Sequence, residues 1–159
     1  MLNAEILNQA IGGYWFEGAS LDDELKSLKP DLITVAYGTN DYSLSETLEI
    51  FINGARGFMD RLTEIFPDTP VLAIMPIWRA DRKFHDRSRM LDYSSTDAFA
   101  ALREMYAGYS NVTVLEDTYF PTSPDFLNSE DRLHPNDLGF TFYADAVTDA
   151  SKKLLNIVY

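Results

Sequence analysis

Residues 32–41 read Leu-Ile-Thr-Val-Ala-Tyr-Gly-Thr-Asn-Asp, an apolar run that stops at a turn-forming tetrapeptide. Two similar runs follow along the chain, Val71–Ile77 (VLAIMPI) and Val112–Leu115 (VTVL). Short, near-continuous apolar runs are typical of strands that are covered on both faces of a parallel sheet. A weaker run, Ala4–Ala10, ends before the pair Gly12-Gly13, and we expect it to be a strand as well.

Helical patterns lie between the expected strands. Three helix starts are indicated by capping residues: Ser43 with Glu46 at the spacing of a capping box, Ser94, and Asn136 or Asp137. Pro67 and Gly108 end the first two helices. Alternating strands and helices predict a single α/β domain over residues 1–159, with helices on both faces of a mostly parallel sheet.

Composition narrows the classes of function. The net charge of -12 repels phosphate backbones and anionic lipid, so we expect neither a nucleic-acid nor a membrane partner. The chain has no cysteine, which excludes disulfides and thiolate chemistry and is compatible with the cytoplasm, where we expect the protein. Residues 1–5 have no basic region or long apolar stretch, so we expect no signal peptide.

The sequence contains no residue pattern typical of a metal or cofactor site. Two histidines and scattered carboxylates give no metal-ligand set, so we expect no metal. A flavodoxin-like domain that binds a phosphorylated cofactor is an alternative, but the chain has no glycine-rich phosphate loop. We therefore expect no cofactor.

Two short motifs can carry chemistry. In Asp131-Arg132-Leu133-His134, a carboxylate three residues before an imidazole can accept a hydrogen bond from Nδ1 and leave Nε2 as a general base. In Gly38-Thr39-Asn40-Asp41, an amide held at a strand end can donate to a developing oxyanion. Taken singly, each motif is explained at least as well by an ordinary loop, since Asp and Asn are good turn and capping residues.

The two motifs together, in this order, resemble the SGNH (GDSL-type) ester hydrolase family. The resemblance covers nearly the whole chain from Asn8 onward and implies a three-layer α/β/α, flavodoxin-like sheet. It assigns Asp131 and His134 to a Ser-His-Asp triad, and Asn40 to the oxyanion hole. Residues 8–13 (NQAIGG) look like the block that supplies a further oxyanion N–H. Gly13 is its closest positional match, and Gly12 is the alternative.

One block of that family is missing from these 159 residues. The chain contains no Gly-Asp-Ser, and none of its eleven serines sits in a strand-to-helix elbow. The resemblance therefore implies that the first strand, the nucleophile and the first helix are absent. In the related fold that strand lies between those represented here by residues 4–10 and 32–37. Its absence would leave unpaired backbone groups, each costing on the order of 1–3 kcal/mol if buried.

These features lead to two expectations about function. The first is an acyl-serine ester hydrolase of small-molecule substrates that is inactive as this isolated chain. The second is a non-catalytic remnant or assembly module of the same fold. In either case exposed strand edges recruit strands, so we expect a homo-oligomer or a strand-complemented assembly.

Two further groups of residues surround the expected site. The basic segment Arg79–Arg89 (RADRKFHDRSR) is interpreted as a solvated loop, with an electropositive mouth for a carboxylated or phosphorylated substrate as the alternative. The aromatic residues Tyr14, Trp15 and Phe16 can stack on a sugar or hold an acyl chain at a cleft, or can pack in the core.

Overall fold

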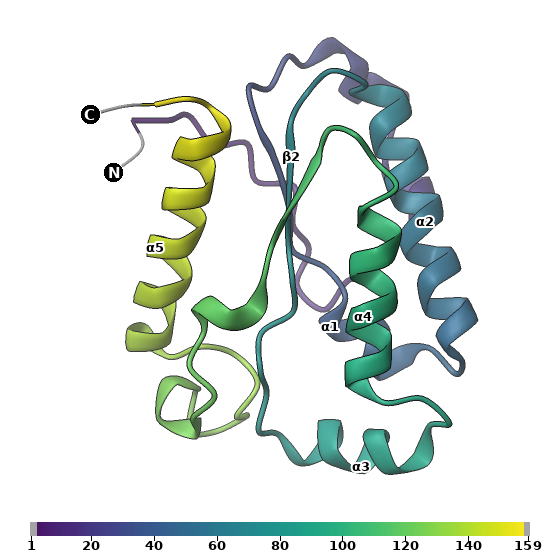
Figure 1. The fold of residues 1–159 in the computed structure, drawn as a ribbon, viewed down its shortest axis with the longest axis vertical. Helices are drawn as coiled ribbons and strands as arrows, with labels where there is room; N and C mark the ends of the chain where they lie inside the picture. The colour runs from purple at the N-terminus through teal and green to yellow at the C-terminus, as the bar shows by residue number, and fades with distance from the viewer. Residues whose placement is uncertain (1–2, 158–159) are drawn as a thin grey trace.

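The computed structural model describes residues 3–157, which form a parallel sheet with helices on both faces (Figure 1). The three strands are β1 (Ile33–Val35), β2 (Val71–Ile74) and β3 (Val112–Leu115), in the order β1-β2-β3. In register, Ile33 lies beside Val71, and Val71 beside Val112. The α/β class with a parallel sheet flanked by helices is confirmed. Residues 1, 2, 158 and 159 of the expected domain lie outside the described part.

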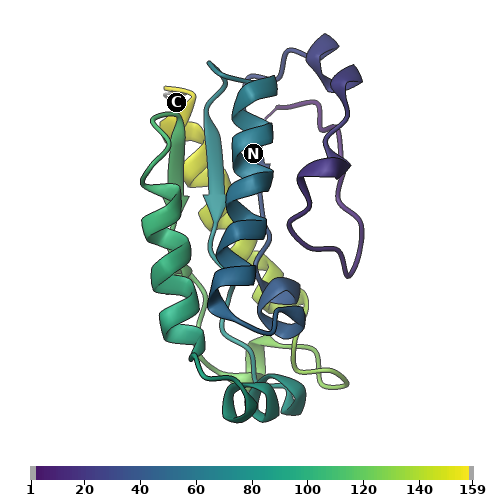
Figure 2. The ribbon, with the colours of Figure 1, turned by 90° about the vertical axis from the view of Figure 1, so that its right-hand side faces the viewer.

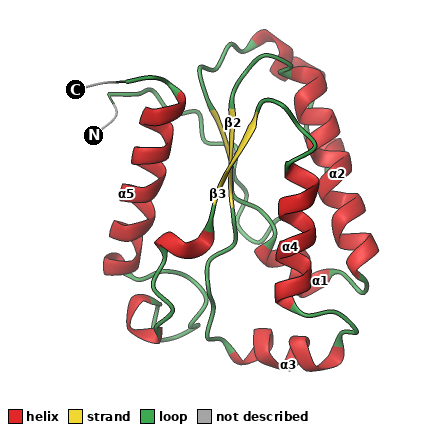
Figure 3. Cartoon of the chain, viewed as in Figure 1, coloured by secondary structure: helices red, strands yellow, loops and turns green. Residues whose placement is uncertain are grey.

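The described chain also contains five α-helices: α1 (Thr39–Leu44), α2 (Leu48–Ile65), α3 (Arg82–Met90), α4 (Ser95–Tyr106) and α5 (Asp137–Leu154). Four short 3-10 helices lie at Gly18–Ser20, Asp23–Ser27, Asp117–Tyr119 and Pro124–Phe126. Helices α2 and α4 cover one face of the sheet and α5 covers the other (Figure 3). Because the strands are parallel, their carboxyl ends meet at one edge, and the short helices α1 and α3 lie there (Figure 1). Among the described residues, no helix is long and apolar enough to cross a membrane.

The main core lies between the sheet and the helices α2 and α4. Apolar residues of α2 recur every three or four positions and are buried: Phe51, Ala55, Phe58, Met59, Leu62 and Ile65. From the sheet, Val71 and Ala73 point to the same side, while Leu72 is buried outside this cluster. Burial of such side chains provides the main driving force of folding.

The strand expected at Ala4–Ala10 is not formed. Residues 3–10 have no regular secondary structure, Ile6 is 83% exposed, and Leu7 is exposed as well. Figure 2 shows this N-terminal segment on the β1 side of the sheet, but it does not pair with β1. A strand needs a neighbour to satisfy its backbone groups, and no strand of the described chain lies between β1 and this segment.

Two other local expectations are wrong, and two are confirmed. Thr47, not Ser43, caps α2, because its Oγ1 accepts from Ile50 N at 3.2 Å; Ser43 lies inside α1. The basic segment is not a solvated loop, since most of it forms α3 behind the cap Asp81. The cap Ser94 for α4 is confirmed, and of the two candidates for α5, Asn136 and Asp137, the structure has Asn136 as the cap.

The corrected cap gives a first prediction. Replacing Thr47→Ala removes the acceptor for Ile50 N, so the free energy of unfolding should fall by about 1 kcal/mol. Glu46→Ala should change it by less than about 0.5 kcal/mol, since Glu46 is exposed and lies outside the helix. Urea unfolding followed by circular dichroism measures both variants. A larger loss of unfolding free energy for Glu46→Ala than for Thr47→Ala would contradict this prediction and favour the Ser43–Glu46 capping box expected from the sequence.

Candidate active site

The Asp131–His134 loop places a carboxylate against an imidazole. Asp131 Oδ2 lies 2.7 Å from His134 Nδ1, while Asp131 Oδ1 accepts from Leu133 N at 2.8 Å and from His134 N at 3.1 Å. The hydrogen bond from the His134 ring, helped by these two backbone N–H groups, lowers the pKa of Asp131 to about 2. With Nδ1–H donating to this carboxylate, Nε2 of the neutral ring is free to accept a proton. The His134 side chain is 69% exposed, so that nitrogen is open to a reactant.

Backbone contacts hold this loop in front of α5. Asn128 N donates to His134 O at 2.8 Å, and Arg132 N donates to Asn128 O at 2.8 Å. Asn136 then caps α5 by accepting from Gly139 N at 2.9 Å. Arg132 has a φ of 53°, a left-handed conformation that is uncommon for a residue other than glycine. The loop geometry is therefore imposed by its surroundings.

Asn40 is the second residue of α1, the helix that follows β1. The preceding Gly38 has a φ of 112°, and a Cβ there would lie 2.9 Å from Pro76 Cγ, so a glycine is required. Asn40 Nδ2 donates to Tyr14 O at 2.9 Å. An amide nitrogen carries two hydrogens, and this bond uses one of them. The other can serve an oxyanion.

The N-terminal glycine block lies beside Asn40 although it is far from it in the sequence. Asp41 Oδ1 accepts from Phe16 N at 2.8 Å and its Oδ2 accepts from Gly38 N at 3.0 Å. Gly13, with a φ of 78°, belongs to a turn closed by Tyr14 N and Ile11 O at 3.2 Å. Since Tyr14 O accepts from Asn40, the Gly13 turn adjoins the Asn40 amide along the chain.

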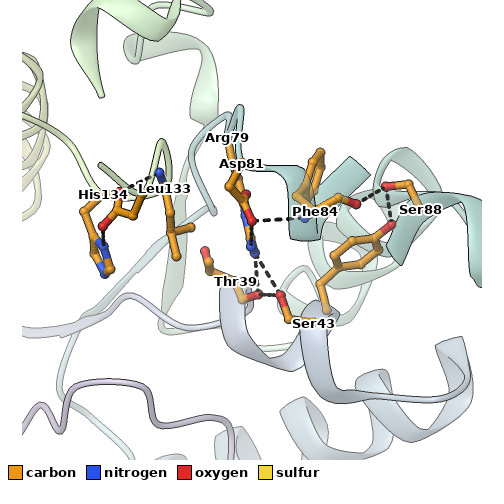
Figure 4. A network of polar contacts seen from close by, with 10 residues as sticks. Thr39, Ser43, Arg79, Asp81, Phe84, Ser88, Leu133 and His134 are labelled. Carbon is orange, nitrogen blue, oxygen red and sulfur yellow. Dashed lines mark hydrogen bonds and ion pairs between the residues drawn. The ribbon is translucent and has the colours of Figure 1, made fainter. Parts of the chain in front are cut away.

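The Asn40 side and the His134 side share one edge of the sheet. Arg79, which follows β2, donates from Nη1 to Thr39 O at 3.1 Å (Figure 4). Ala80 N donates to Arg132 O at 3.0 Å. This chain of contacts links the residue before Asn40 to the loop that carries His134. The sequence analysis missed Arg79, which is only 3% exposed and lies in a segment interpreted as solvated. Its position directly after a buried strand was the available signal.

An open hollow of about 480 Å³ adjoins the Asp131 loop, between residues 80–83 and 130–132. Cationic and anionic side chains line it together: Arg82, Lys83 and Arg132 with Asp81, Glu130 and Asp131. This mixed lining gives no simple electropositive mouth. Among residues 3–157, no group of three or more His, Asp or Glu side chains is placed to hold a metal ion.

Comparison with known proteins identifies the family. Residues 2–141 match the sequence profile described as the GDSL-like lipase/acylhydrolase family. The chain belongs to this family. Its match covers both motifs and the N-terminal glycine block. Comparison with functionally curated proteins found no match.

Solved structures share the fold of this GDSL-like chain. A carbohydrate esterase family 3 protein from Talaromyces cellulolyticus is 17% identical, with a TM-score of 0.60 over 85% of this chain and 63% of that protein. A lipase/acylhydrolase from Enterococcus faecalis is 22% identical, with a TM-score of 0.58 over 78% of this chain and 62% of that one. LAE5, an alpha/beta hydrolase from the metagenome of Lake Arreo, is 20% identical, with a TM-score of 0.63 over 89% of this chain and 70% of that one. The GDSL-like chain thus spans less than two thirds of the first two proteins.

The lowered pKa of Asp131 gives a second prediction. A depressed pKa means that the pairing with His134 stabilises the folded state above the usual carboxyl pKa and is lost as the pH falls toward about 2. His134→Ala should therefore raise the pKa of Asp131 toward the ordinary value of about 3.9. Its backbone donors remain, so the rise should be incomplete.

Carboxyl carbon chemical shifts, followed by NMR between about pH 2 and 5, measure this titration. Asp97 is the internal control, because Ser94 lowers its pKa at the start of α4, away from His134. In the parent protein both carboxyls should have a pKa below the ordinary aspartate value. In the His134→Ala variant only the pKa of Asp131 should rise. An unchanged Asp131 titration would show that the ring and the carboxylate are not paired in solution.

Proposed function

We propose that this chain carries the acid–base pair and the oxyanion donors of a serine ester hydrolase that acts through an acyl-serine intermediate. The observation that carries the proposal is the 2.7 Å contact between Asp131 Oδ2 and His134 Nδ1, which leaves Nε2 free as a base. The GDSL-like family match supports the same class of chemistry. The substrate class is a small-molecule ester.

Each residue then has one role in the reaction. His134 Nε2 takes the proton of a serine hydroxyl while its oxygen attacks the ester carbonyl carbon. The second Asn40 amide hydrogen and the Gly13 N–H stabilise the oxyanion that forms. When the tetrahedral intermediate collapses, the protonated His134 returns the proton to the leaving alcohol. Water then repeats the sequence on the acyl-serine and releases the acid. Asp131 holds the ring in the required tautomer and stabilises its charged form.

The nucleophile is the missing member of this set. Within residues 3–157, the side-chain partner of His134 is Asp131, and no serine hydroxyl bonds to its ring. We infer that the serine enters the site from a polypeptide segment that these 159 residues do not include. A base without its nucleophile restores little activity, since triad members act as a unit. The isolated chain should therefore have negligible esterase activity.

The open edge of the sheet supports an assembly role. β1 is the end strand, its Thr34 is exposed, and the neighbouring N-terminal segment exposes Ile6 and Leu7 without pairing. Unpaired edges and exposed apolar side chains favour association with a further strand. We propose a strand-complemented or homo-oligomeric assembly. A non-catalytic module that keeps only this assembly role is the second candidate, favoured because no serine among the described residues bonds to the His134 ring.

An acylated carbohydrate is the substrate that the site supports best. Tyr14 and Trp15 are stacked, with ring centroids 4.9 Å apart, and Trp15 is 42% exposed. Tyr14 O accepts from the Asn40 amide, so this aromatic pair adjoins the oxyanion donors. Exposed aromatic faces stack on the apolar faces of sugar rings. Phe16, in contrast, is a core residue.

The third prediction concerns activity. The isolated chain should hydrolyse p-nitrophenyl acetate no faster than its His134→Ala variant, and a fluorophosphonate probe should label neither. A chain extended at its N-terminus by a strand, a Gly-Asp-Ser turn and a helix should gain hydrolysis and labelling, and both should depend on the added serine. Burst hydrolysis by the isolated chain, abolished by His134→Ala, would show that it already contains a nucleophile. An extended chain that folds but neither hydrolyses nor labels would favour the non-catalytic module.

The fourth prediction concerns assembly. Sedimentation should give a mass well above the 18.0 kDa of one chain, because the unpaired backbone groups of β1 and the exposed apolar residues of the N-terminal segment favour association. Ile6→Lys places a charge on this segment and should shift the distribution toward the monomer. Ile50→Lys is the matched control, since Ile50 is also exposed but lies on α2. A stable monomer at all concentrations would contradict the proposal, as would an equal effect of the two variants.

A further inference from the structure

Arg79 is a buried guanidinium whose donors are directed into the protein. Nε and Nη2 donate to the two carboxylate oxygens of Asp81, at 2.8 and 3.1 Å. Nη1 donates to Thr39 O at 3.1 Å and to Ser43 Oγ at 3.0 Å. Five guanidinium hydrogens are available, and these contacts use four of them. With 3% of its surface exposed, Arg79 has no open face for a ligand.

Arg79 and Asp81 form a bidentate ion pair although only Ala80 separates them in the sequence. The N–H of Ala80 donates to Arg132 O at 3.0 Å. Arg132 is the residue with the left-handed backbone inside the Asp131–His134 loop. A single tripeptide thus contacts α1 through the Arg79 side chain and contacts the His134 loop through the backbone of its middle residue.

Neighbouring contacts keep the tripeptide in place. Asp81 also caps α3, because its Oδ2 accepts from Phe84 N at 3.0 Å. The Phe84 ring lies against the guanidinium, with Arg79 Cζ 5.0 Å from the ring centroid. A planar, bidentate arginine–carboxylate pair is geometrically specific, and lysine cannot reproduce it. The pair is therefore suited to fixing a distance between two elements.

We propose that the Arg79–Asp81 pair is a positioning device that sets the Asn40 helix and the Asp131–His134 loop at a fixed separation. Asn40 follows Thr39, whose carbonyl is held by Arg79, and His134 follows Arg132, whose carbonyl is held by Ala80. The inference rests on the proposed function for its meaning, since a hydrolase needs its oxyanion donor and its base in register. Its geometry can be tested without turnover.

The test replaces Arg79 and follows NMR signals of the Asp131–His134 loop and of Asn40. Arg79→Met removes the guanidinium but keeps most of the side-chain length. Hydrogen exchange of the Leu133 and His134 amides, which donate to Asp131, should become faster by about tenfold or more. The ring-nitrogen shifts of His134 should move away from a fixed Nδ1–H tautomer, and the Asn40 side-chain amide signals should move as well.

Two further variants and a control make the result decisive. Arg79→Met combined with Asp81→Asn leaves no buried unpaired charge and retains an acceptor for the α3 cap, so it covers the case in which the single variant does not fold. Ser43→Ala removes one of the four contacts and should give a smaller change of the same kind. Arg61→Met is the matched control, because Arg61 is ion-paired to Asp23 and Glu64 away from this edge.

The expected pattern is a change at His134 and Asn40 in the Arg79 variants, with core amides of α2 and the Arg61 variant unaffected. The proposal is overturned if folded Arg79 variants keep the His134 ring signals and the loop exchange rates of the control. It is also overturned if every amide accelerates equally, since that is general destabilisation. Because no turnover is measured, an inactive extended chain would count against the proposed function and leave this result standing.

Discussion

The buried carboxylate of Asp41 is the contact on which the site geometry depends. It accepts one hydrogen bond from Phe16 N and one from Gly38 N, and so fastens the N-terminal segment to the turn after β1. That segment has no strand pairing of its own. Burial raises the pKa of Asp41, while the two N–H donors oppose the rise. Without this carboxylate the two N–H groups would be left unsatisfied, at about 1–3 kcal/mol each if they stayed buried.

Three aspartates on the same edge act differently because their surroundings differ. Asp41 is buried without a cation, and its pKa rises. Burial also opposes ionisation of Asp81, but the hydrogen bonds and charge of Arg79 outweigh it and lower the pKa. Asp131 is exposed, and the His134 ring lowers its pKa to about 2. In our proposals, this one residue type fastens the N-terminal segment, sets a distance between two elements, and orients a base.

In our proposal, the described residues lack one member of the hydrolase triad. The GDSL-like family match and the Asp131–His134 contact agree on ester chemistry, yet no serine reaches the ring within residues 3–157. The outer side of β1 has no strand partner in the described chain, and the unpaired residues 3–10 lie on the same side of the sheet (Figure 2). In our proposal, a strand from a segment outside these 159 residues would both pair with this edge and bring the nucleophile, whereas a second copy of the chain would only cover the edge.

The sequence by itself determined the α/β class, the three paired strands, the caps Ser94 and Asn136, and the family, because apolar periodicity, capping and motif order are local properties of the chain. The tertiary structure decided the rest. Ala4–Ala10 has a strand-like pattern but no neighbouring strand to pair with. Thr47 rather than Ser43 caps α2, because Ser43 lies inside α1, where its hydroxyl accepts from Arg79. Arg79 is buried among Thr39, Ser43 and Phe84, which come from other parts of the chain. Such long-range contacts leave no periodic trace in the sequence, so only the folded chain reveals them.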